Sequence, residues 1–207
     1  MTPDRTQLAV AYVGSCCPHV GAFHGTTEVH SYLRDTAADL RAAAPSSAFP
    51  DRYSEYVAYA MDVIATADFL SPPAAIASVY LATRFEYYFR VLSGRLNADG
   101  TWVSPADQAA TQSKINDHRL GRKQVSSVSL AYKIMKLAAA RPLSQCCSAL
   151  DATIYAKPTT AGGKGIADLG DRIEFGRHAV GHGHWGDISA EGVFYGLVTA
   201  LVFYNQA

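Results

Sequence analysis

The hydrophobic pattern along the chain predicts helices over most of its length. Apolar residues recur at helical spacing in several stretches, the clearest of which are 29–40, 52–70, 72–93 and 125–140. No convincing run of alternating apolar and polar residues indicates a strand. We therefore predict an all-α fold, a single helical bundle.

Local signals give the organisation of that bundle. Pro72 follows a serine and suits a first helical position, and Gly94 ends the same helix. The short apolar run 8–13 is compatible with a strand or a buried helical turn. We expect residues 1–50 to form an N-terminal extension with one helix, and residues 51–207 to form the bundle.

Two helices near the C-terminus flank a polar segment. The first covers 166–175, and Gly176 is expected to loosen its end, so that Arg177 lies in or just past the last turn. Ser189 is the expected N-cap of the second, which runs to about Tyr204. The intervening RHAVGHGH places Arg177 and His182 five positions apart. A guanidinium suits phosphate and an imidazole moves protons near neutrality, so this pair predicts phosphodiester cleavage.

This segment resembles the R-x4-6-H signature of the HEPN superfamily, whose members are small all-helical bundles. His178 fills the polar position after the arginine, and the resemblance extends over about residues 73–205. Many members are metal-independent ribonucleases of toxin–antitoxin and antiviral defence systems. The resemblance therefore implies an endoribonuclease that needs no cofactor, with catalytic residues Arg177, His182 and Glu86, the last on the early core helix. An ordinary i,i+4 salt bridge with Arg90 is the alternative role of Glu86.

The resemblance also implies partners. RNA is the expected substrate, an antitoxin or other protein is a possible partner, and such proteins usually build their site as homodimers. The C-terminal helix fits this expectation, because residues 192–204 contain no charged side chain. A helix that is apolar all round is either central to its own bundle or covered by a second subunit. We expect one of its two apolar stripes to meet a second copy.

Charge is distributed unevenly although the net charge is zero. Residues 1–70 hold four basic and eight acidic groups, whereas residues 118–177 hold ten basic and four acidic ones. A local positive excess attracts a polyanion. We therefore expect Lys133 and Lys136, exposed together on their helix, to bind substrate with His178 and His184.

Other interpretations of the same residues remain open. The chain is alternatively a non-catalytic HEPN-like module that binds RNA, a nucleotide or a protein. His178, His182 and His184 could instead hold a metal ion in one histidine loop, and a zinc site on Cys16, Cys17, His19 and His24 is a further alternative to buried thiols. We expect no metal. Because the sequence shows neither a signal peptide nor an apolar run of membrane-spanning length, we expect a cytoplasmic protein without membrane contact.

Overall fold

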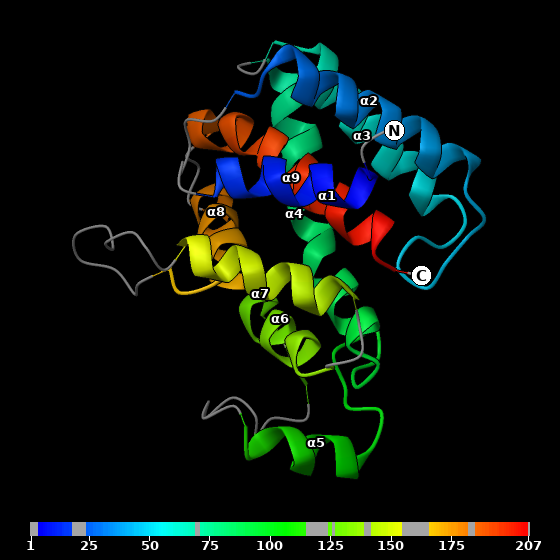
Figure 1. Cartoon of the computed structure of the whole chain (residues 1–207), viewed down its shortest axis with the longest axis vertical. Helices are drawn as coiled ribbons and strands as arrows, with labels where there is room; N and C mark the ends of the chain where they lie inside the picture. Colours follow the sequence, from blue (N-terminus) through cyan, green and yellow to red (C-terminus); the bar gives the residue numbers. More distant parts are fainter. Residues whose placement is uncertain are drawn as a thin grey trace.

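The computed structural model describes residues 4–17, 24–68, 71–114, 124–125, 127–138, 142–154, 166–181 and 185–206. These ranges contain nine helices and no strand, which confirms the all-α fold (Figure 1). The helices are α1 (Arg5–Cys16), α2 (Thr27–Ala42), α3 (Tyr53–Thr66), α4 (Pro72–Ser93), α5 (Pro105–Gln112), α6 (Val128–Lys136), α7 (Pro142–Ile154), α8 (Leu169–Gly181) and α9 (Trp185–Tyr204). No helix in the described ranges is long and apolar enough to cross a membrane.

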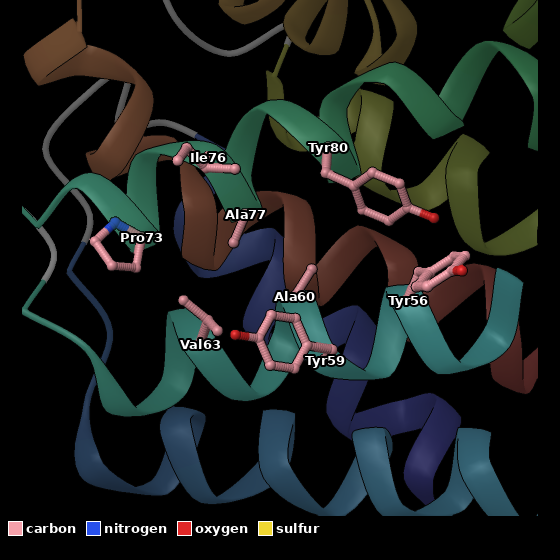
Figure 2. Close-up of a pocket in the computed structure, with 8 residues that line it drawn as sticks. All are labelled: Tyr56, Tyr59, Ala60, Val63, Pro73, Ile76, Ala77 and Tyr80. Carbon is pink, nitrogen blue, oxygen red and sulfur yellow. The ribbon is translucent and has the colours of Figure 1, made fainter.

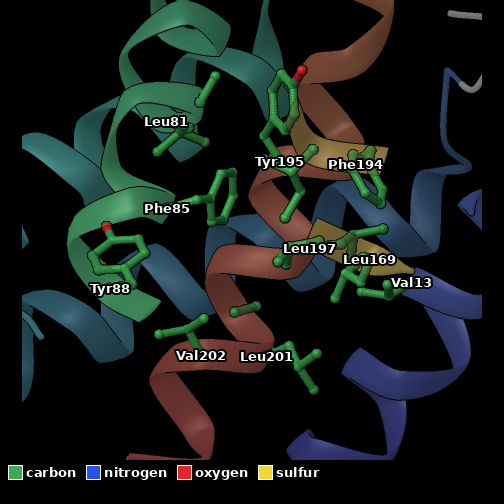
Figure 3. Packing of buried hydrophobic residues seen from close by; sticks show 14 of the residues in the cluster. Val13, Leu81, Phe85, Tyr88, Leu169, Phe194, Tyr195, Leu197, Leu201 and Val202 are labelled. Atoms are coloured by element: carbon green, nitrogen blue, oxygen red, sulfur yellow. The ribbon is translucent and has the colours of Figure 1, made fainter. Parts of the chain in front are cut away.

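Helix α9 is the centre of the bundle. It packs against α1, α2, α3, α4 and α8, and every residue from 191 to 202 is buried. Figure 3 shows side chains of α9 among buried residues of α1, α4 and α8. Gly192 permits a close approach to α4, because a Cβ at this position would lie 2.3 Å from the Ser78 hydroxyl. The apolar composition of α9 is thus explained by burial within its own chain.

This central position corrects one prediction about the C-terminal helix. Val193, Leu197 and Leu201 of one stripe are fully covered, and so are Phe194 and Val198 of the other. Neither stripe is left to meet a second copy, so the expectation of a dimer through this helix is wrong. Homodimerisation through another surface stays a prediction.

The N-terminal 50 residues contain two helices where one was expected. The apolar run 8–13 belongs to α1, which begins at an Asp4 cap and packs on α7 and α9. Ala9 and Val13 of α1 share one core with α2 and α9. The N-terminal segment is therefore part of the main hydrophobic core.

Helix boundaries agree with the local signals at α4 and depart from them near the C-terminus. Helix α4 begins at Pro72 and ends before Gly94, as predicted. Ser71 is its N-cap, and Gly94 adopts the left-handed conformation. Helix α8 continues through Gly176 to Gly181, so Arg177 lies inside the helix. Helix α9 begins at Trp185, four residues before the expected Ser189 cap. Helix α7 was not predicted at all.

Candidate functional site

An ion-paired cluster joins α4 to α8 at the position of the predicted catalytic residues. Arg177 Nη1 of α8 donates to Glu86 Oε2 of α4 over 3.3 Å, although 91 residues separate them in sequence. The other oxygen of Glu86 accepts from Arg90, one turn along α4. Two of the three predicted catalytic residues are therefore in contact.

Arg90 links this cluster to the segment after α4. Besides Glu86, its guanidinium donates to the backbone carbonyls of Ala98 and Val125, over 3.2 and 2.5 Å. Arg90 thus has a structural role as well as an electrostatic one. It holds Glu86 at a fixed position on the face that receives Arg177.

The cluster of Arg90, Glu86 and Arg177 carries a net charge of about +1, because two guanidinium groups share one carboxylate. Arg177 keeps 28% of its side chain exposed, more than either partner. A guanidinium has five donors, and Glu86 accepts one of those of Arg177. The arrangement can therefore present a positioned cation to an anionic group from solvent.

A buried ion pair supports α8 beneath this cluster. Arg172, one helical turn and a half before Arg177, donates to both carboxylate oxygens of Glu191 on α9, over 2.6 and 2.8 Å. Both side chains are almost completely buried. Sequence reasoning did not identify this pair, and its available signal was a single glutamate at the start of an otherwise apolar stretch, 191–204.

Tyr195 of α9 lies against α8 at Gly176, the residue before Arg177. A Cβ on Gly176 would lie 2.1 Å from its hydroxyl oxygen, so only glycine permits this approach. The hydroxyl is buried and forms no hydrogen bond to any residue that the structure describes. Burial raises the pKa of this phenol, which keeps it neutral. Gly176 is thus a packing residue and does not end the helix.

The remaining residues of the predicted catalytic segment are only partly described. His178 is exposed on α8, next to Arg177. His182 and His184 lie outside the described residues, as do the side chains of residues 179–190. The backbone shows that α8 ends at Gly181, directly before His182.

The two lysines expected to bind substrate are both ion-paired. Lys133 Nζ lies 3.2 Å from Asp171 and 3.7 Å from Asp168, and it also donates to the Ser129 hydroxyl. Lys136 pairs with Asp151 of α7. These contacts join α6 to α7 and α8, so the lysines are not the exposed pair that the helical spacing predicted. Their role in substrate binding stays a prediction.

Asp168 is the buried carboxylate of this second cluster. Its pKa is raised from an ordinary value of 3.8 to about 6, mainly by burial. The charge of nearby Asp171 also favours the raised pKa, whereas the Asp171 backbone N–H and Lys133 oppose it. Its Oδ1 accepts from that N–H over 2.8 Å and caps α8. The folded state therefore binds a proton at Asp168 more tightly than the unfolded chain does.

Asp168→Asn is expected to stabilise the protein by about 3 kcal/mol at pH 8 and by only about 1 kcal/mol at pH 4.5, because the pKa shift of Asp168 corresponds to about 1.4 kcal/mol per unit. A raised pKa gives stability that is complete below pH 3.8 and is lost as the pH rises through about 6. Asparagine removes the charge and keeps an oxygen that caps α8. Urea unfolding of both proteins at pH 4.5 and 8 measures the difference. An equal difference at the two pH values would contradict the assigned pKa.

The cysteines do not form a metal site among the described residues. Burial raises the pKa of Cys17 to about 12 and also raises that of Cys16 and Cys147, which disfavours the thiolate that zinc needs. No group of three or more His, Cys, Asp or Glu in the described ranges is arranged to hold a metal ion. His19, part of the zinc alternative, lies outside those ranges. Cys16, Cys17 and Cys147 fit the interpretation as buried thiols, and Cys146 is partly buried.

Comparisons of the chain with protein-family models, with curated proteins and with solved structures give no match. The functional argument therefore rests on the residues of this chain and their contacts.

Proposed function

We propose that the chain is a metal-independent endoribonuclease of the HEPN type. The observation that carries the proposal is the contact of Arg177 with Glu86. These are two of the three residues to which the resemblance gives a catalytic role. Arg177 and Glu86 are 91 positions apart in the sequence, and a chance contact over that separation would not be expected to join these two residues in particular.

The charge of the cluster supports phosphate as its ligand. Glu86 is shared by Arg90 and Arg177, so the group remains cationic, and Arg177 is its most exposed member. In the proposed reaction Arg177 binds the scissile phosphate and stabilises the additional negative charge of the pentacoordinate state. Glu86 orients Arg177.

The proposed chemistry uses the nucleophile that RNA itself supplies. The 2′-oxygen attacks phosphorus and loses its proton to His182, which acts as general base. The bond from phosphorus to the 5′-oxygen breaks, and that oxygen takes up a proton. The products are a 2′,3′-cyclic phosphate and a free 5′-hydroxyl. The proposed reaction requires no cofactor, because the RNA supplies the nucleophile and the remaining steps are proton transfers.

We expect the purified protein to cut single-stranded RNA in excess EDTA and to leave single-stranded DNA intact, because DNA lacks the 2′-hydroxyl. His182→Ala should abolish cutting, whereas His30→Ala, a histidine of α2, should not. Gel analysis of a labelled oligonucleotide measures both. Cutting that requires added zinc, or that survives His182→Ala, would overturn this mechanism.

The same experiment separates the two other functions that the sequence allows. A non-catalytic module would bind the RNA without cutting it, and its affinity would be unaffected by His182→Ala. A histidine-loop metal protein would retain stoichiometric metal through purification. Metal analysis of the purified chain therefore complements the cleavage assay.

A further inference from the structure

An exposed aromatic groove runs between α3 and α4 (Figure 2). Its volume is about 390 Å³, within the range of about 300–1,000 Å³ that is typical of small-ligand sites. Tyr59 and Ile76 on its two sides are 66% and 67% exposed, which is unusual for large apolar side chains. The groove is lined by Tyr56, Tyr59, Ala60, Val63, Pro73, Ile76, Ala77 and Tyr80.

Arg84 lies one turn after Tyr80, a residue that lines the groove, on α4. The guanidinium of Arg84 lies 4.6 Å from the ring centre of Tyr53 and 4.7 Å from that of Tyr87. No carboxylate in the described ranges forms a salt bridge with it. Arg84 is half-buried among the tyrosine rings, and its Nε is buried. Aromatic rings and a cation without a carboxylate partner in the described ranges are therefore close together, and this combination suits a ligand with both flat rings and negative charge.

The acidic residues of α3 do not oppose such a ligand. Glu55 and Asp62 both pair with Arg41 of α2, over 3.2 and 2.7 Å. Their charge is thus directed to the α2 side of α3. The groove itself is lined by no acidic residue.

Helix α4 contributes residues both to the groove and to the Arg177 cluster. Ile76, Tyr80, Thr83 and Tyr87 follow the spacing of one helical stripe, and Glu86 lies on the stripe beside it, to which Thr83 also belongs. Thr83 is exposed between the two. Six residues separate Tyr80 from Glu86, which corresponds to about 9 Å along the helix axis and about 120° around it. About three stacked nucleotides, at roughly 3.4 Å each, cover the axial part of this separation.

We propose that the aromatic groove binds nucleobases of the single-stranded RNA whose phosphate lies at Arg177. This inference rests on the proposed function. Bases stack on Tyr56, Tyr59 and Tyr80, and Arg84 faces the backbone. The rings supply affinity that depends little on sequence, because every base has a π-face.

The test separates stacking from apolar contact at one position. Tyr59→Leu keeps an apolar side chain and loses the ring, whereas Tyr59→Phe keeps the ring. The probe is a single-stranded deoxyoligonucleotide that contains 2-aminopurine, whose fluorescence falls on stacking and which resists 2′-hydroxyl cleavage. We expect Tyr59→Leu to raise the Kd about 10-fold or more and Tyr59→Phe to leave it within about 2-fold.

Each other outcome overturns the inference. Failure of the wild type to bind and quench the probe, or equal affinity of Tyr59→Leu and wild type, excludes base stacking in the groove. A fall of the mass in light scattering from dimer to monomer in Tyr59→Leu assigns the groove to a second copy of the chain. RNA cleavage measured in parallel tests the proposed function by itself, because the deoxy probe reports the groove whether or not RNA is cut.

Discussion

Arg177→Ala is expected to lower the rate of RNA cleavage about 100- to 1,000-fold, the usual effect of removing one donor that stabilises a developing charge. The free energy of unfolding should fall by less than about 1 kcal/mol, because a partly exposed ion pair contributes little to stability. The measurements are single-turnover cleavage of a labelled RNA and urea unfolding of the same preparation.

A matched control is available on α1. Arg5 pairs with Asp35 over 3.4 Å and is comparably exposed, but it lies outside the cluster. Arg5→Ala should leave cleavage unchanged. Glu86→Gln should reduce cleavage less than Arg177→Ala, since the amide oxygen still accepts from Arg177. Full activity of Arg177→Ala would remove the basis of the proposed site.

Arg172→Leu is expected to destabilise the fold by about 3–5 kcal/mol, because it leaves Glu191 buried without its cation. The two side chains are 1% and 3% exposed, and the guanidinium also lies 4.4 Å from the ring centre of Phe194. Since the pair ties α8 to α9, its loss should also reduce cleavage. Urea unfolding at pH 7 measures the stability.

A double substitution separates the charge effect from loss of packing. Arg172→Met combined with Glu191→Met removes both charges and retains much of the volume, so it should recover most of the lost stability. Arg5→Ala again serves as the exposed control, with an effect within about 1 kcal/mol. If Arg172→Leu lowered the free energy of unfolding as little as Arg5→Ala does, the pair of Arg172 and Glu191 would contribute nothing to the stability of the fold.

Sequence alone was sufficient where structure depends on neighbouring residues. Ser71, Pro72 and Gly94 determine where α4 begins and ends, because caps and backbone preferences act within a few residues. Because residues 192–204 are apolar on every side, the sequence allowed two possibilities, a helix at the centre of its own bundle or a helix covered by a second subunit. Only the tertiary structure decided that α1, α2, α3, α4 and α8 provide that coverage.

The candidate site shows the same division. The chemistry of Arg177 and Glu86 was apparent from residue type and from the resemblance, but their contact depends on how α8 packs against α4 and α9. Gly176 suggests a helix end locally, yet its role is to admit the hydroxyl of Tyr195 from another helix. The carboxylates that pair with Lys133 and Lys136 likewise come mostly from later helices. Sequence therefore determined which residues prefer helix and which carry charge, whereas packing between distant helices decided which charges meet, because the energy of an ion pair depends on a separation in space that local pattern does not specify.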